Sequence, residues 1–339
     1  MRSSQVTIKD IAKHLGISAS TVSRALKDHP DISEETKRMV KDLAAKLKYQ
    51  PNALALSLKN SKSNTIGVII PEVVHYFFSQ VISGIEDVAY NAGYTVVICQ
   101  SNERYVREVA NTKALLAQRV DGVLVSISKE TQDLEHLHNV EDHNIPMVFF
   151  DRRCSDIEAD SVLIDDFNAA YQATKHLLKL GRKRIAHLGG PMHMDIGRLR
   201  KEGYMQALKD FDVEVDEALI FEANTFEDAP GCVQKMMQYK NPPDSLFAVN
   251  DLTAIGAIQA IQNMGLKIPE DISVVGFSDG RFSNIINPKL TSVDQHGYEM
   301  GRKATEILIK RIKEDQREYD PVTEIIPGTL IVRDSSVNR

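Results

Sequence analysis

The chain of 339 residues has only three cysteines, which lie far apart at Cys99, Cys154 and Cys232. An odd number with this spacing fits neither a disulfide framework nor a CxxC metal site, so we expect free thiols. No apolar run approaches the roughly 20 residues that a membrane span needs. The start, MRSSQVTIKD, lacks the apolar core of a signal peptide. These absences make the cytoplasm the expected compartment.

The chain also lacks the short motifs of common catalytic sites. It contains no GxSxG, no Walker A loop and no GxGxxG at a strand–helix junction. Its ten histidines show no HExxH spacing. We therefore expect a binding protein and not an enzyme, with no metal and no cofactor.

What the chain does have is a basic start followed by an acidic remainder. Residues 1–63 hold 12 Lys or Arg and 6 Asp or Glu, a net charge of +6, whereas the remaining 29 basic and 41 acidic residues give −12. A basic head on an acidic body is expected if only the head meets phosphates. A merely solvated basic face is the alternative.

Within this head, residues 6–26 predict two short helices joined by a tight turn. Thr7 and Asp10 form a capping-box pattern at the first helix, and Ser18 is a strong N-cap for the second helix. Gly16 supplies the backbone freedom for the turn. The second helix keeps its apolar side toward the first, so small polar groups and one arginine face outward. A helix-turn-helix that reads double-stranded DNA needs this arrangement; an ordinary helical hairpin is the alternative.

A third helix, at about residues 34 to 47, is expected to complete the head. We expect four of its apolar residues to point inward: Met39, Val40, Leu43 and Leu47. Tyr49-Gln50-Pro51-Asn52 then breaks the pattern, and a short helix-prone piece, ALALSLKN, leads into a polar linker. The predicted divisions are a helix-turn-helix domain at 1–50, a hinge helix and linker at 51–64, and a body at 65–339.

From Thr65 the pattern changes to apolar strands that alternate with amphipathic helices, which is typical of parallel sheets covered on both faces. The stretch is long for one sheet, so we predict two sheets in two lobes, with a ligand cleft beyond the carboxyl ends of the strands. The expected strands are 65–70, 95–99, 122–126, 146–150, 161–164, 184–189, 245–249 and 272–277. The helices between them include 79–91, 104–118, 168–180, 198–210, 252–263 and 298–313.

Taken in order, these pieces resemble the lactose/galactose repressor (LacI/GalR) family of bacterial transcription factors along essentially the whole chain. The helix-turn-helix, YQPNALALSLK and TIGVIIP follow one another as in that family. Similar pieces further on include RVDGVLV (119–125), GRKRIAHLGGP (181–191), RLRKEGYMQAL (198–208) and DISVVGFSD (271–279). The resemblance implies an all-α head and a bilobed α/β body like periplasmic sugar-binding proteins. It also implies a homodimer that binds a near-palindromic operator.

By this resemblance the second helix enters the major groove of DNA. Arg24 is the expected base reader, because arginine can bond bidentately to guanine. Ala19 could touch a thymine methyl group, and Ser20 would specify a base only weakly. Phosphate contacts or helix caps are expected from the remaining hydroxyl residues: Thr7, Ser18, Thr21 and Ser23.

Residues 53–60 resemble the hinge helix of the family, which is too short to be stable alone. The matching leucine, Leu58, is expected to wedge into the minor groove and kink the duplex. Packing on the body is the alternative for Leu58 and the expected role of Leu54 and Leu56. The residues of this segment assigned to DNA are Asn52, Ala55, Leu58 and Lys59.

In the body, the resemblance places effector contacts just after several strands. Arg200 matches a family arginine that holds the effector by charge-assisted bonds. Asp151 could accept hydrogen bonds from hydroxyls or hold a neighbouring arginine, and Asn250 could contact the effector or cap a helix. One ring of Tyr76, Phe77 and Phe78 is expected to face the ligand, with Phe78 preferred and core packing as the alternative for each.

One departure from the family lies at the strand end Gly276-Phe277-Ser278-Asp279. Many members carry two acidic residues here, so with Ser278 in the first position a carboxylate contact is missing. Asp279 could replace it or only cap a turn. The expected effector is a carbohydrate or a derivative, ahead of a nucleobase or a phosphorylated metabolite. Effectors that tighten and effectors that release DNA both occur in the family.

Two other functions fit parts of the pattern. A non-regulatory sugar-binding α/β protein with an accessory head would have no use for the basic charge of that head. A non-specific nucleoid binder would not need a cleft domain of this size. The end of the chain, Ile331–Arg339, has no leucine heptads that could build a tetramer, so a dimer is expected.

Overall fold

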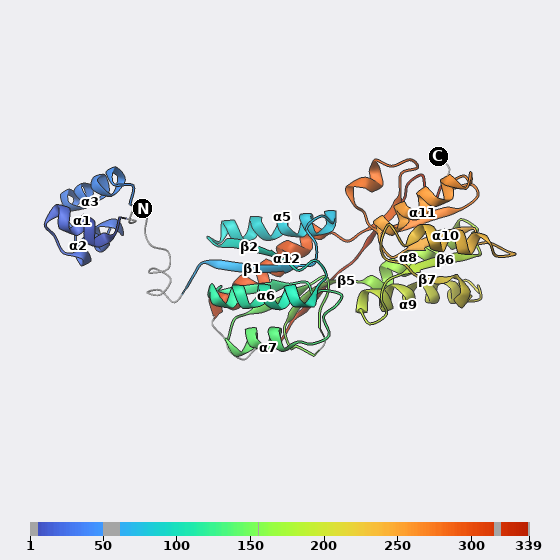
Figure 1. Ribbon diagram of the computed structural model, residues 1–339, viewed down its shortest axis with the longest axis horizontal. Helices are drawn as coiled ribbons and strands as arrows, with labels where there is room; N and C mark the ends of the chain where they lie inside the picture. Colours follow the sequence, from blue (N-terminus) through green and yellow to red (C-terminus); the bar gives the residue numbers. More distant parts are fainter. Residues whose placement is uncertain (1–5, 50–61, 155, 315–319, 338–339) are drawn as a thin grey trace. The chain divides into compact units, whose positions relative to one another are not determined.

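The computed structural model describes residues 6–49, 62–154, 156–314 and 320–337. It divides into two compact units, Met1–Asn64 and Thr65–Arg339 (Figure 1). Asn52, Ala55, Leu58 and Lys59, the predicted hinge residues, lie outside the described residues. Of the helices in the described ranges, none combines the length and apolar character needed to cross a membrane.

The first unit contains α1 (Ile8–Leu15), α2 (Ala19–Leu26) and α3 (Glu34–Lys46). The capping box is confirmed, because Thr7 N–H donates to Asp10 Oδ2 over 2.8 Å and Asp10 N–H donates to Thr7 Oγ1 over 3.3 Å. Ser18 caps α2 by accepting from the backbone N–H of Thr21 over 3.0 Å. Gly16 ends α1 with φ at +65°, a left-handed conformation that glycine adopts without strain.

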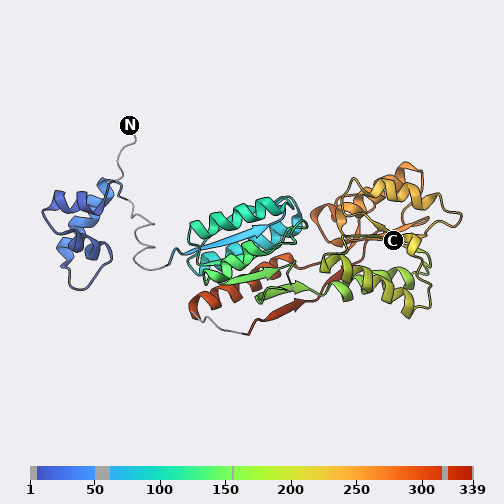
Figure 2. The ribbon, with the colours of Figure 1, turned by 60° about the horizontal axis from the view of Figure 1, so that its bottom comes forward.

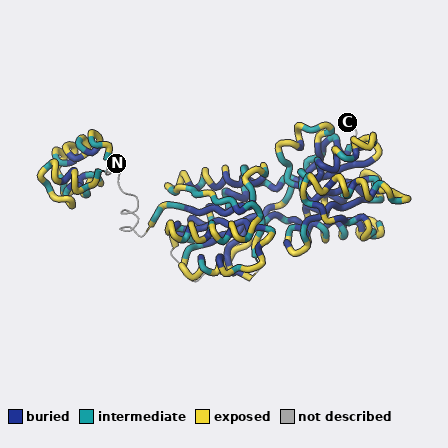
Figure 3. The backbone as a smooth tube through the Cα atoms, in the orientation of Figure 1, coloured by how far each residue is buried: buried dark blue, intermediate teal, exposed yellow. Residues whose placement is uncertain are grey.

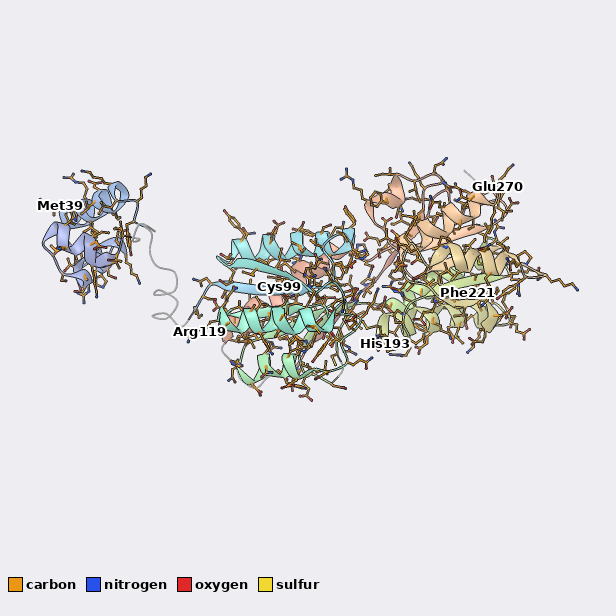
Figure 4. The ribbon with its side chains drawn as sticks, viewed as in Figure 1. Met39, Cys99, Arg119, His193, Phe221 and Glu270 are labelled. Carbon is orange, nitrogen blue, oxygen red and sulfur yellow. The ribbon has the colours of Figure 1, made fainter. Side chains whose placement is uncertain are left out.

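The three helices bury a small apolar core. Ile11, Val22, Ala25 and Val40 are fully buried. The expectation for Met39 was wrong, because its side chain is 45% exposed and projects from the surface (Figure 4). Val40 and Ala44 lie four residues apart and set the buried stripe of α3, and a residue one position earlier is turned by about 100° around the helix axis.

The second unit has the two sheets that the sequence predicted, and each has six strands. The first sheet is wholly parallel in the order β11-β5-β4-β3-β1-β2. The second has the order β12-β10-β9-β8-β6-β7, and only β12 runs antiparallel to its neighbour. The strands of the first lobe are β1 (Thr65–Ile70), β2 (Thr95–Gln100), β3 (Gly122–Val125), β4 (Met147–Phe150), β5 (Asp160–Ile164) and β11 (Thr323–Ile326). Those of the second lobe are β6 (Ile185–Gly189), β7 (Ile220–Glu222), β8 (Ser245–Ala248), β9 (Ser273–Ser278), β10 (Thr291–Asp294) and β12 (Thr329–Ile331).

Helices cover both faces of each sheet, so most strands are buried along their length (Figures 2 and 3). The first sheet packs between α5 and α12 on one face and α6 and α7 on the other. The second packs between α8 and α9 on one face and α10 and α11 on the other. Their bounds are α5 (Tyr76–Asn91), α6 (Tyr105–Ala117), α7 (Glu135–Asp142), α8 (Asp166–Lys179), α9 (Asp195–Asp210), α10 (Ala229–Met237), α11 (Asp251–Asn263) and α12 (Gly297–Glu314).

Two glycines let α5 and α12 approach very closely. A Cβ atom added to Gly84 would lie 2.1 Å from the carbonyl oxygen of Tyr298, and one added to Gly301 would lie 2.0 Å from that of Val81. Both distances are far below van der Waals contact with backbone atoms. The two helices therefore meet backbone to backbone on one face of the first sheet.

The chain passes between the lobes three times in the described residues, after β5, after β10 and after β11. The passages lie side by side, because Asp165 N–H donates to the carbonyl oxygen of Ile326 over 2.9 Å. A Cβ atom at Gly328 would meet side-chain atoms of Ile164 and Val293 within 3.3 Å. The lobes are thus joined at one edge, which leaves the carboxyl ends of the central strands facing each other.

Candidate DNA-reading surface and effector cleft

Three residues of α2 form the candidate base-reading surface: Ala19, Ser20 and Arg24. All three are exposed, while Val22 and Ala25 of the same helix are fully buried against the core. The helix therefore presents the face that sequence periodicity predicts. The hydroxyl of Ser20 shares a hydrogen bond of 2.6 Å with that of Ser18, so it is held at the start of the helix.

Arg24 lies near the carboxylate of Asp31. Its Nη1 atom lies 4.0 Å from Oδ2 of Asp31, and 58% of the arginine side chain is exposed. His29 lies 3.4 Å from the same carboxylate. An exposed pair of this length contributes little to stability, so the guanidinium can leave Asp31 for a base edge at small cost.

In the body, Arg200 is the most firmly held of the predicted effector residues. Only 3% of the residue is exposed, and it lies on α9. Its Nε donates to Asp166 Oδ1 over 2.7 Å and its Nη1 donates to the carbonyl oxygen of Val249 over 2.5 Å. Its guanidinium carbon stands 3.5 Å from the ring centre of Phe277. Burial raises the pKa of Asp166 to about 6, although Arg200 opposes the shift.

Asn250 fills one of the two roles that the sequence left open for it, that of a helix cap. It caps α11, because its Oδ1 accepts from Thr253 N–H over 2.9 Å. Its amide nitrogen donates to the backbone oxygen of Asn224 over 2.9 Å. Contact of Asn250 with an effector stays a prediction. Val249, which accepts from Arg200, precedes it directly, so the two predicted effector residues meet at the end of β8.

Lys129 connects the lobes beside Asn224. Its Nζ donates to Asn224 Oδ1 over 2.8 Å, and its backbone oxygen pairs with Nε2 of His193 over 2.9 Å. His193 is labelled in Figure 4, and the next residue, Met194, packs among apolar side chains of the first lobe. Burial lowers the pKa of Lys129. The loop before α9 therefore touches the opposite lobe through polar and apolar groups.

On the side of the first lobe, Asp151 follows β4 with φ at +61° and is 6% exposed. Ser126 Oγ donates to Asp151 Oδ2 over 3.3 Å, and Nε of Arg152 lies 3.6 Å from the same oxygen. Burial raises the pKa of Asp151, while the charges of Arg152 and Arg200 oppose the shift. Asp151 thus does hold its neighbouring arginine, one of the two roles expected for it, and its hydrogen bonding to an effector stays a prediction.

Ser278 and Asp279, the residues at the departure from the family, both have positive φ angles, at 121° and 47°. Asp279 makes a two-pronged ion pair with Arg333, and its backbone N–H donates to Ser292 Oγ over 3.1 Å. These bonds give Asp279 a structural role at the end of β9. An effector contact by Ser278 or Asp279 stays a prediction.

The two phenylalanines of the predicted site are buried at the start of α5. Phe77 is 6% exposed and Phe78 is 4% exposed, and both belong to the main apolar core. Their rings form an edge-to-face pair with centres 5.2 Å apart. This burial favours core packing, the alternative stated for both rings, over contact with a ligand.

The residues around the cleft that sequence reasoning missed include Asp166, Phe277, Lys129 and Asn224. Each contacts a predicted residue or bridges the lobes, but its partner is far away in the sequence. A usable signal existed for Asp166, which comes two residues after the strand 161–164 and starts a helix. In the described part of the chain, no group of three or more His, Cys, Asp or Glu side chains is arranged to hold a metal ion. The three cysteines are free and partly buried.

A helix-turn-helix head on a two-lobed body with polar groups in its cleft defines a ligand-responsive DNA-binding regulator. Residues 7–52 match the family described as "Bacterial regulatory proteins, lacI family". Residues 63–332 match "Periplasmic binding proteins and sugar binding domain of LacI family". The chain belongs to the LacI family of bacterial transcriptional regulators.

Relatives and solved structures match along nearly the whole chain. The HTH-type transcriptional repressor PurR of Actinobacillus pleuropneumoniae serotype 3 (strain JL03) is 33% identical over 334 residues, covering 98% of each chain. PurR of Vibrio vulnificus (strain CMCP6) is 33% identical and covers 97% of this chain and 98% of its own. The lac repressor dimer bound to operator and the anti-inducer ONPF is 26% identical with a TM-score of 0.85, covering 98% of this chain and 100% of that one. The CelR–cellobiose complex, with the same identity and coverage, has a TM-score of 0.74.

Proposed function

We propose that this regulator represses metabolic genes in the cytoplasm by binding a near-palindromic operator as a homodimer. The exposed face of α2 carries the proposal, because Ala19, Ser20 and Arg24 stand clear of the core that Val22 and Ala25 anchor. Two such helices in a symmetric dimer would read two half-sites. The operator-bound dimer of the lac repressor and the repressor PurR support this assignment by similarity.

The body would tune DNA affinity through a small-molecule effector, a carbohydrate or a derivative, held by Asp151, Arg200 and Asn250. Arg200 offers charge-assisted donors to ligand oxygens, and Asn250 can donate and accept. The cellobiose bound by CelR supports a carbohydrate. An effector can shift DNA affinity only if it binds two states of the body unequally. We place the coupling in the hinge segment, where Leu58 would wedge into the operator centre.

The experiment is an anisotropy titration of the full chain against an operator selected from random duplexes, next to an unselected duplex, across a salt series. We expect a specificity ratio of about 10³ or more, with affinity for both duplexes falling as salt rises. Sedimentation of the same sample checks for the dimer. A chain that stays monomeric and binds selected and unselected duplexes alike would contradict the proposal.

A further inference from the structure

The charged groups around the effector cleft form a balanced set. Each of three cations has a carboxylate within 4 Å, and the set holds as many carboxylates as cations. The pairs are Arg200–Asp166 at 2.7 Å, Arg152–Glu103 at 2.9 Å, Arg152–Asp151 at 3.6 Å and Lys129–Glu103 at 3.7 Å. These six groups therefore carry no surplus charge of either sign when all of them are ionised.

The Arg200–Asp166 pair is the deepest of these. The two side chains are 4% and 5% exposed, and the arginine also lies against the Phe277 ring and the Val249 carbonyl. Asp166 is the first residue of α8, and Asp165 caps that helix, so the backbone fixes where the carboxylate stands. Arg200 thus meets a ligand with its charge already compensated by the protein.

A buried charge without a partner is costly, whereas a neutral hydroxyl can exchange hydrogen bonds with the same donors at little cost. A carboxylate or phosphate placed beside Arg200 would also lie close to Asp166 and within the field of Asp151. Binding it would bring a surplus negative charge into a site that has none to match. A neutral polyhydroxylated molecule brings no such surplus.

We infer that the effector is a neutral hydroxyl-rich molecule, and that Asp166 is the residue that excludes sugar acids and sugar phosphates from Arg200. This inference rests on the proposed function, in which Arg200 and Asp151 face the effector. The proposed function allows both neutral carbohydrates and their acidic derivatives, which share the same hydroxyl groups. The inference keeps only the neutral ones. Asp166 acts by compensating the positive charge of Arg200, so that the pair presents no net charge to a ligand.

The same helix provides a matched control. Arg198 pairs with Asp195 over 2.8 Å, but these side chains are 45% and 46% exposed. Removing the Asp195 carboxylate leaves an arginine that water can solvate and that Glu202 still pairs over 3.1 Å, whereas removing the Asp166 carboxylate leaves a buried arginine. Asp195→Ala thus controls for the loss of a carboxylate at the start of a helix, without leaving a buried arginine unpaired.

The first probe is formate, a carboxylate small enough for the space that Asp166→Ala leaves. Melting temperatures are measured in sodium formate and in sodium chloride at equal ionic strength. We expect formate to raise the melting temperature of Asp166→Ala by several degrees more than that of the wild type or of Asp195→Ala. An equal gain in the wild type would overturn the inference, because Arg200 would then already accept an added anion. An equal gain in the two variants would overturn it as well.

The second probe uses the wild-type chain, so it does not depend on a variant that folds. Neutral hexoses and disaccharides are tested in thermal shift beside the matching acids and 6-phosphates, such as glucose with gluconate and glucose 6-phosphate. We expect stabilisation by a neutral member and none by its charged partners. In Asp166→Asn the preference should move toward the charged member by about tenfold or more. A wild type stabilised more by an acid or a phosphate than by its neutral counterpart would refute the inference.

Operator binding by the same preparation distinguishes failure of the inference about Asp166 from failure of the proposed function. If the chain binds a selected operator and a charged metabolite alters that binding, the inference about Asp166 fails while the proposed function stands. If the chain binds no duplex specifically, the proposed function fails, and the formate experiment still reports whether Asp166 alone compensates Arg200.

Discussion

Arg333 donates hydrogen bonds to Asp279 from both of its terminal nitrogens, over 2.5 Å from Nη1 to Oδ1 and 3.0 Å from Nη2 to Oδ2. The same Nη1 donates to the carbonyl oxygen of Leu290 over 2.7 Å. The two side chains are 10% and 14% exposed. This pair fastens the segment after β12 to the end of β9, on the rim of the cleft.

Replacing Arg333 should therefore be costly. We expect Arg333→Ala to lower the free energy of unfolding by about 3–5 kcal/mol, because it leaves the Asp279 carboxylate without its buried partner. Arg302→Ala is the control, since Arg302 pairs with Glu299 and Glu306 on an exposed face and should matter little. Urea midpoints of the three chains test this; equal midpoints for the two variants would contradict it.

The contact between α5 and α12 predicts that Gly301→Ala destabilises the body by about 1–3 kcal/mol or more, because its Cβ would lie 2.0 Å from the oxygen of Val81. Gly231→Ala, in α10, is the control, since a Cβ there has no neighbour within 4 Å. That variant should gain about 0.5–1 kcal/mol from helix propensity. Calorimetric melting separates the two, and a neutral Gly301→Ala would argue against the close helix contact.

His187 gives the fold a specific sensitivity to acid. It is fully buried between Tyr204 and Phe247, and burial lowers its pKa to about 4. Between pH 4 and the unfolded pKa of about 6.5, the unfolded chain holds a proton that the native chain does not, so stability rises with pH across this window. At pH 4 and below, the free energy of unfolding is about 3 kcal/mol lower on account of His187 than it is above pH 6.5.

His187→Asn should remove this dependence, because an amide does not titrate and can still donate toward the Phe247 carbonyl. Asp166, with its pKa raised to about 6, acts in the opposite direction in both chains, so it cancels in the comparison. Unfolding free energies from urea titrations at pH 4.5, 5.5 and 7 provide the measurement. If the difference between the two chains did not change with pH, the burial argument for His187 would be wrong.

In the head, Arg24→Ala should relax base preference at one position of each half-site. A bidentate arginine–guanine contact discriminates by roughly 1–3 kcal/mol, so the base preference there should fall by about 5- to 150-fold. Arg38→Ala, an exposed arginine on α3 away from the reading face, should leave the preference unchanged. Titration against operators with every base at each half-site position reads this out, and identical profiles for wild type and Arg24→Ala would count against the assignment.

Leu58→Ala should weaken binding to operator far more than binding to random duplex, because only a specific complex repays the unstacking of a base step. Leu56→Ala is the paired control, since packing on the body is its expected role. Gel-shift titrations on both duplexes measure the two losses. Equal losses of affinity for operator and random DNA would contradict the proposal that Leu58 inserts into the minor groove.

The eight strands predicted from the sequence are all present, because each is a continuous apolar run between turn residues. Four further strands were not predicted. β7 and β12 have three residues each, β10 reads TSVD, and β11 is partly exposed at the sheet edge, so none carries a strong apolar signal. The short helices α7 and α10 were also missed.

Local sequence patterns predict even less of the candidate site than of the fold. Arg200 and Asn250 are identifiable from local motifs, whereas the residues that hold Arg200 lie 34 positions before it and 77 after it, at Asp166 and Phe277. Only the meeting of α8, α9 and β9 at one end of the second sheet brings them together. Charge compensation at Arg200 is thus a property of the tertiary fold that no segment of the sequence contains by itself.

The three passages between the lobes have a consequence for how such a protein can be cut or recombined. Within the described residues, neither lobe is one continuous stretch of chain. A protease nick in any one passage leaves two covalent links, so the halves stay together. A single genetic crossover within the body would leave at least one lobe of mixed parentage, and ligand preference is therefore more readily altered by point substitution than by exchange of a whole lobe.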